Sequence, residues 1–122
     1  MVIVDTDIFI DFLRNMPAAR EFIEQHLYHI NFSAITEAEL LSGKECNDEN
    51  VRKKLLHFLS QFEKIPFDNP LVQVAGEFRR VHGVDLPDAI IAATAFMGDT
   101  TLYTRNTKHF EKVKSISVTK PY

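Results

Sequence analysis

The chain has 122 residues, 45% of them hydrophobic and 25% charged, which suits one compact domain spanning residues 1–122. It has no run of 18 apolar residues, and Asp5 interrupts the first apolar run, so we expect no membrane span, no signal peptide and a cytoplasmic location. The net charge of −3 excludes a global positive field for nucleic acid, and the single cysteine, Cys46, excludes an internal disulfide or a thiolate metal cage.

Hydrophobic periodicity in the first part of the chain predicts strands that alternate with helices. Residues 2–4 form an apolar run typical of a buried parallel strand, and apolar residues at helical spacing follow it. We expect a second helix over residues 18–29 and a second strand over residues 30–35. Thr36 is expected to begin a third helix, which Gly43 ends.

The rest of the chain continues the same alternation. The pattern predicts, in order, a loop at 47–50, an amphipathic helix over 51–62, a short extended piece near 65–67, a helix after Pro70, a helix over 88–97, and strands near Leu102 and at 116–118. Residues 88–97 are apolar almost all round, which is typical of a helix packed centrally. The sequence therefore predicts an α/β fold, with a central, mainly parallel sheet flanked by helices.

Three acidic residues occupy the same topological place, which is the exit of a strand or the opening turn of the next helix. They are Asp5, Glu39 and Asp88. In an open parallel sheet these places converge on the crevice beyond the carboxyl ends of the strands. Each acid also has a simpler interpretation. Asp5 can cap the following helix, Asp88 can complement a helix dipole, and Thr36 with Glu39 fits a capping box.

Convergence of three carboxylates favours a bound divalent cation, because the charges repel one another and are costly to desolvate without a counter-charge. Oxygen ligands without thiolates or paired histidines suit Mg²⁺ or Mn²⁺. Such an ion supports hydrolysis of a phosphodiester bond. Arg105, at the end of a predicted strand near this site, is expected to hold a phosphate of the substrate.

Four segments of the chain together resemble the successive motifs of the PIN domain family, closest to the VapC toxins of toxin–antitoxin pairs. They read IVDT at 3–6, SAITEAELLSG at 33–43, PDAIIAATA at 87–95 and TRNTKHF at 104–110. The order is that of the family and the likeness spans the chain. The resemblance implies a PIN-like domain with Mg²⁺- or Mn²⁺-dependent endoribonuclease activity, a homodimer, and a VapB-like antitoxin protein whose tail fills the acidic groove.

The resemblance also assigns roles to individual residues. Asp5, Glu39 rather than Glu37, and Asp88 correspond to the metal-coordinating acids of the family, and Thr6 corresponds to the hydroxyl residue beside the first acid. The family often has a fourth acid where this chain has Asn106.

The amide of Asn106 removes one negative charge, so one ion is expected to suffice. We hypothesise that Asn106 contacts a water molecule of the ion's shell. Two further acids lie close to the motif positions. Asp7 or Asp85 can partly replace the missing charge, although Asp85 is equally plausible as a helix cap.

Two other functions remain open from the sequence. Asp5-Thr6-Asp7 after an apolar strand resembles the nucleophile motif of haloacid-dehalogenase phosphatases, although that family expects Thr or Val where Phe9 stands. A PIN module that binds RNA or protein without cleaving it is the other alternative, with Asn106 as its mark, and the three retained acids argue against it.

Overall fold

Five short strands form one sheet in the order β3-β2-β1-β4-β5, and every neighbouring pair runs parallel. The computed structural model describes all 122 residues. Its strands are β1 (Val2–Val4), β2 (Ile30–Ser33), β3 (Glu63–Ile65), β4 (Leu102–Tyr103) and β5 (Val118–Thr119). The predicted α/β fold is confirmed, and the sheet is parallel throughout.

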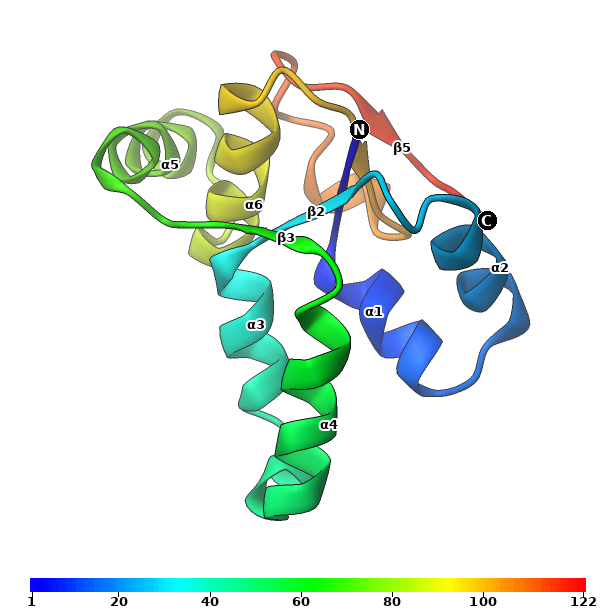
Figure 1. The fold of residues 1–122 in the computed structure, drawn as a ribbon. Coiled ribbons are helices and arrows are strands. Elements are labelled where there is room, and N and C mark those ends of the chain that lie inside the picture. Colours follow the sequence, from blue (N-terminus) through cyan, green and yellow to red (C-terminus); the bar gives the residue numbers. More distant parts are fainter.

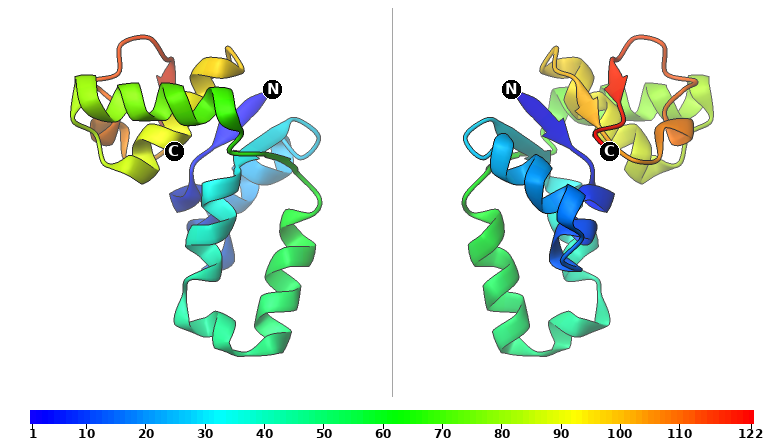
Figure 2. Two further views of the ribbon diagram at one scale, coloured as in Figure 1. Left: turned by 90° about the vertical axis from the view of Figure 1, so that its left-hand side faces the viewer. Right: turned by 90° about the vertical axis from the view of Figure 1, so that its right-hand side faces the viewer.

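Six helices surround this sheet. They are α1 (Thr6–Leu13), α2 (Pro17–Gln25), α3 (Ala34–Leu41), α4 (Glu49–Leu59), α5 (Asn69–His82) and α6 (Leu86–Met97), and two 3₁₀ turns are η1 (Lys44–Asn47) and η2 (Thr107–His109). Figures 1 and 2 show α5 and α6 on one side of the sheet, and α3 and α4 as a pair that projects away from it and is joined by η1. None of the helices is both long and apolar enough to cross a bilayer.

Side chains of β1 alternate between the two faces of the sheet, and each face has its own hydrophobic cluster. Ile3 belongs to the cluster that includes α5 and α6, whereas Val2 and Val4 belong to the cluster that includes α1, α2 and α4. Helix α6 is buried almost all round, from Ala89 to Ala95, as its apolar sequence predicts. Packing on both faces fixes β1 in the centre of the molecule.

Several predicted boundaries move because of local capping. The second helix ends at Gln25 instead of residue 29. The second strand ends at Ser33, whose hydroxyl accepts a hydrogen bond from the Ile35 amide at 3.2 Å and so begins α3 two residues before Thr36. The predicted loop at 47–50 is mostly helical, because Asp48 accepts the Asn50 amide at 2.8 Å and caps α4.

The order of the strands creates a crevice beside β1. The chain crosses from β1 to β2 on one side and later returns to β4 on the other side. The direction of the connections therefore reverses at β1, and ligands of open parallel sheets bind at such a reversal, beyond the carboxyl ends of the strands. Asp5 directly follows β1, so it stands at the centre of this edge.

Candidate active site

Asp5 uses both carboxylate oxygens within the protein. Oδ1 accepts a hydrogen bond from the Thr6 amide at 2.7 Å, which caps α1, and Oδ2 accepts one from Thr104 Oγ1 at 2.7 Å. Burial, followed by the negative charge of Asp7, raises the pKa of Asp5 from 3.8 to about 7. The predicted capping role is confirmed, but it accounts for only one of the two oxygens.

Glu39 is linked to α1 through the hydroxyl of Thr6, the residue that follows Asp5. Thr6 Oγ1 is 2.7 Å from Glu39 Oε1 and 2.9 Å from Thr36 Oγ1. Because a hydroxyl carries one proton, Thr6 donates to the carboxylate and accepts from Thr36. The capping box predicted for Thr36 and Glu39 is wrong, since Ser33 caps α3 and Glu39 reaches across to α1.

Glu37, the other acid of α3, is engaged elsewhere. Its carboxylate accepts a hydrogen bond from Lys64 Nζ at 3.0 Å. A fixed cation therefore already neutralises Glu37, whereas Glu39 has only hydroxyl donors. This difference agrees with the choice of Glu39 as the second acid of the site.

Asp88 lies in the first turn of α6, where the sequence predicts it. Burial raises its pKa, the nearby His109 opposes that shift, and the charges of Asp85, Glu39 and Asp7 add to it. His109 Nδ1 is 3.3 Å from Asp88 Oδ2. We did not expect His109 at the site, since scattered histidines usually serve the surface or the core.

Of the two additional acids, only Asp7 lies in the carboxylate cluster. Asp7 Oδ2 accepts the Arg105 amide at 2.9 Å and is 3.4 Å from Thr104 Oγ1, while its Oδ1 is buried and has no hydrogen-bond partner. Burial raises the pKa of Asp7. The Asp85 side chain is 87% exposed and lies 3.6 Å from Arg79 Nη1, so it stands outside the cluster.

The loop after β4 carries the last two predicted residues. The Asn106 amide donates to Thr104 Oγ1 at 3.0 Å, while its side chain is exposed and takes part in none of the hydrogen bonds. The guanidinium of Arg105 points to Asp11, with Nη1 at 3.2 Å from Asp11 Oδ2. The backbone amide of Arg105 therefore contacts Asp7, and that of Asn106 contacts Thr104, which itself bonds Asp5.

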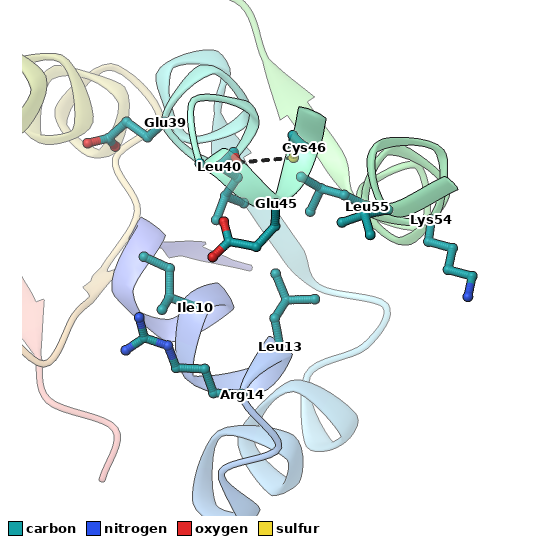
Figure 3. A pocket seen from close by; sticks show the side chains of 11 residues that line it. Ile10, Leu13, Arg14, Glu39, Leu40, Glu45, Cys46, Lys54 and Leu55 are labelled. Atoms are coloured by element: carbon teal, nitrogen blue, oxygen red, sulfur yellow. Dashed lines mark hydrogen bonds between the residues drawn. The ribbon is translucent and has the colours of Figure 1, made fainter. Parts of the chain in front are cut away.

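A groove opens next to Glu39, between α1, α3, η1 and α4. Its cavity measures about 530 Å³. Figure 3 shows apolar side chains of α1, α3 and α4 facing the groove, with charged side chains around them; the labelled residues are Ile10, Leu13, Arg14, Glu39, Leu40, Glu45, Cys46, Lys54 and Leu55. Of the proposed site acids, only Glu39 lines this largely apolar groove.

A family model described as PIN domain matches residues 2–116 of the chain. The chain belongs to the PIN domain family. It is similar to Ribonuclease VapC10 of Mycobacterium tuberculosis, with 32% identity over 117 residues that cover 90% of this chain and 86% of the relative. Ribonuclease VapC19 of the same organism is 30% identical over 118 residues, which cover 90% and 92%. A chain of a toxin–antitoxin complex from Klebsiella pneumoniae superposes with a TM-score of 0.86 at 30% identity, over 100% of this chain and 98% of that one.

The acids of this PIN domain fit a hard divalent cation in their chemistry. As the side chains are placed, no three His, Cys, Asp or Glu residues converge closely enough to hold one ion. The groups that would bind the cation are carboxylate oxygens. Burial, followed by the charge of Asp7, raises the pKa of Asp5, and Asp7 Oδ1 is buried without a hydrogen-bond partner. Each of these conditions is relieved by a cation with oxygen preference.

The sequence did not assign two threonines, Thr36 and Thr104, to the site of this PIN domain. Thr36 and Thr104 are both fully buried. Thr104 donates a hydrogen bond to Asp5 Oδ2, and the hydroxyl of Thr36 is bonded to the hydroxyl of Thr6. The only local signal is the position of Thr104 directly after β4, at the same sheet edge as Asp5. Buried threonines at strand ends have many other roles, so this signal is weak without the fold.

Proposed function

We propose that this PIN domain is a Mg²⁺- or Mn²⁺-dependent endoribonuclease toxin that cuts RNA phosphodiester bonds and is neutralised by a VapB-like antitoxin. The observation that carries the proposal is the identity of 30% to 32% to two proteins named ribonucleases, and the position of Asp5 directly after β1 and of Asp88 in the first turn of α6 supports it. We also propose a cytoplasmic location, where such a substrate is found.

Each residue of the site has a distinct part in this proposal. Asp5, Glu39 and Asp88 would hold the cation, which when bound lowers the pKa of water and balances the charge of the phosphate. Thr6 orients Glu39 through the hydrogen bond of 2.7 Å. Arg105 contributes a guanidinium for a phosphate at the rim, and the exposed amide of Asn106 contacts water at the same edge.

The test is cleavage of total cellular RNA by the purified protein with Mg²⁺, with Mn²⁺ and with EDTA. We expect discrete fragments with metal, none with EDTA, and none from a folded Asp5→Asn variant. Glu24→Gln, an exposed substitution on α2, is the matched control for loss of one negative charge and should cleave like wild type. Full activity of a folded Asp5→Asn protein would remove the proposal.

Intact RNA under every metal condition would favour a different function. A protein that still binds RNA or a partner without cutting either would be a non-catalytic PIN module. Trapping of a phosphoryl group on Asp5 would favour the phosphatase alternative. Phe9, where those phosphatases have Thr or Val, is fully buried in the core, which speaks against that alternative.

The groove beside Glu39 supports the proposed antitoxin partner, because an apolar groove with a charged rim suits an amphipathic segment. Leu13, which is 44% exposed and lines the groove, is the residue to change. Leu13→Glu should weaken binding of the antitoxin about tenfold or more and leave RNA cleavage intact. Leu56→Glu is the control, since Leu56 is 39% exposed on α4 but does not line the groove.

We further propose that the protein is a homodimer. Large apolar side chains are exposed along α5 and α6, and the most exposed are Val81 at 60% and Leu86 at 52%. Exposed apolar side chains of this size are usual where two subunits meet. Light scattering after gel filtration measures the mass directly, and Val81→Glu should shift a dimer toward the monomer.

A further inference from the structure

Arg105 is held in the structure by two distant parts of the chain, α1 and the segment after β5. Its backbone amide donates to Asp7 Oδ2 at 2.9 Å, and its Nη1 donates to Asp11 Oδ2 at 3.2 Å. Tyr122, which follows β5, donates its hydroxyl to the same Asp11 oxygen at 2.8 Å, and its ring centroid lies 5.1 Å from the guanidinium carbon. The roles proposed above use neither Asp11 nor Tyr122.

This cluster is more than an ordinary surface ion pair. An exposed Arg–Asp pair contributes little, because both long side chains must be held in one geometry. Here the side chain of Asp11 is only 16% exposed, and Tyr122 fixes both partners at once. The Arg105 side chain is 37% exposed, so it is held in place while part of it stays open to solvent.

The position of this head suits a phosphate of a bound strand. Asp11 lies one helical turn beyond Asp7 on α1, about 6 Å along the axis. The guanidinium contacts the carboxylate of Asp11, one turn along α1 from Asp7, whereas Asp7 accepts only the backbone amide of Arg105. Nη1 contacts Asp11 and, at 3.9 Å, Met16 Sδ, and Nε is buried, so the N–H groups of Nη2 remain for a phosphate oxygen.

We propose that Asp11 and Tyr122 are positioning residues that hold Arg105 at the rim of the site for an RNA phosphate next to the one that is cut. This inference rests on the proposed ribonuclease function. Tyr122 acts through Arg105 and touches no reacting atom. A guanidinium that is already oriented loses less freedom when the phosphate binds, so the cluster strengthens binding of the substrate and leaves the chemical step unchanged.

The test is a double-mutant cycle with Tyr122→Phe, Arg105→Ala and the pair of both, on the full chain. Tyr122→Phe removes only the hydroxyl and keeps the ring over the guanidinium. We expect it to raise KM for a short labelled RNA by about threefold to tenfold, the loss of one hydrogen bond, while kcat changes less than about twofold. In the Arg105→Ala background the same substitution should change KM by less than about 1.5-fold.

A binding measurement separates this effect from catalysis. Fluorescence anisotropy with the same RNA, in the Asp5→Asn background without cleavage, should give the same ratio of affinities. The salt dependence of binding should fall by about one charge in Arg105→Ala, because one phosphate contact is lost. Tyr28→Phe, on a side chain that is 91% exposed, is the control and should change nothing.

The possible results are distinct. A Tyr122→Phe protein that binds RNA more tightly than wild type overturns the inference, because the cluster then withholds Arg105 from the substrate. An equal loss in both backgrounds also overturns it, because Tyr122 then acts independently of Arg105. If the wild type cleaves no RNA with any metal, the proposed function fails and this inference fails with it; active wild type with additive effects overturns this inference alone.

Discussion

Replacing Asp5 by asparagine should make the metal-free protein more stable at neutral pH. The Asp5 side chain belongs to a residue that is 7% exposed, and its pKa rises from 3.8 to about 7 on folding. Each pKa unit corresponds to about 1.4 kcal/mol, so the ionised carboxylate lowers the free energy of unfolding by up to about 4 kcal/mol. We expect Asp5→Asn to raise the free energy of unfolding by about 1 to 4 kcal/mol, which corresponds to a rise of roughly 4 to 15 °C in Tm.

The local hydrogen bonds can accommodate an amide at this position. The carbonyl oxygen of asparagine still accepts the Thr6 amide, and its NH₂ group can donate to Thr104 Oγ1. Thr104 then turns its own proton to Asp7 Oδ2, which is 3.4 Å away in the wild type. No buried donor or acceptor loses its partner, so the gain from removing the charge is retained.

The pH dependence follows from the direction of the pKa shift of Asp5. Below about pH 4 the carboxyl is protonated in both the folded and the unfolded state. Between about pH 4 and pH 7 the unfolded state binds fewer protons than the folded state, so the free energy of unfolding falls as the pH rises. The loss is complete above about pH 7. Asp5→Asn should flatten this slope, although Asp7 and Asp88, whose pKa values are also raised, leave part of it.

Urea unfolding in EDTA, followed by circular dichroism across this pH range, measures both quantities. Glu24→Gln removes the same charge from an exposed position and should leave the pH slope unchanged. Adding Mg²⁺ should stabilise the wild type more than Asp5→Asn, because a ligand stabilises only the state that binds it. An Asp5→Asn protein no more stable than wild type at pH 7.5, with the same slope, would refute the reasoning.

Three further substitutions test the surroundings of the site. Asp7→Asn should weaken Mn²⁺ binding by about tenfold in calorimetry while Asp85→Asn changes it less than about twofold, because Asp7 has a buried oxygen without a hydrogen-bond partner, whereas Asp85 is exposed and lies beside Arg79; equal effects would contradict this reasoning. Thr6→Val should lower the free energy of unfolding by about 1 to 2 kcal/mol, since its buried hydroxyl is bonded to the fully buried hydroxyl of Thr36 and to the carboxylate of Glu39. His109→Gln should raise the pKa of Asp88, followed by NMR titration without metal, because His109 lowers that pKa; an unchanged midpoint would exclude the contact.

The sequence was sufficient for those parts of the site that depend on the sheet edge. Asp5 and Asp88 follow from a general property of parallel sheets, in which strand exits and helix starts converge. The central position of the helix predicted over 88–97, which is α6 in the structure, could also be predicted, because a helix that is apolar almost all round has to be packed between other elements. Glu39 was open between a cap and a site acid. The structure excludes the cap, since Ser33 at the strand end caps α3, and the role as a site acid stays a prediction.

Other parts of the site could not be read from local patterns. Tyr122 bonds Asp11 across 111 residues of sequence, and Thr104 bonds Asp5 across 99. No periodicity, spacing or capping pattern in the sequence predicts either contact. Both contacts depend on how β4 and the segment after β5 lie against α1. The pairing of His109 with Asp88 has the same origin, since η2 and α6 meet only in the folded chain.

Asp5, Asp7 and Glu39 differ in their partners from the acids outside the site, whereas Asp88 lies 3.3 Å from His109 Nδ1. Glu37 is paired with Lys64 and Asp11 with Arg105, so a cation of the protein balances each. None of the ion pairs involves Asp5, Asp7 or Glu39, which take hydrogen bonds from hydroxyl and amide groups without charge. Neutral donors fix the direction of a carboxylate but leave its charge unbalanced. The chain therefore keeps negative charge at the sheet edge at a cost in stability, which is the arrangement that an external cation binds most strongly.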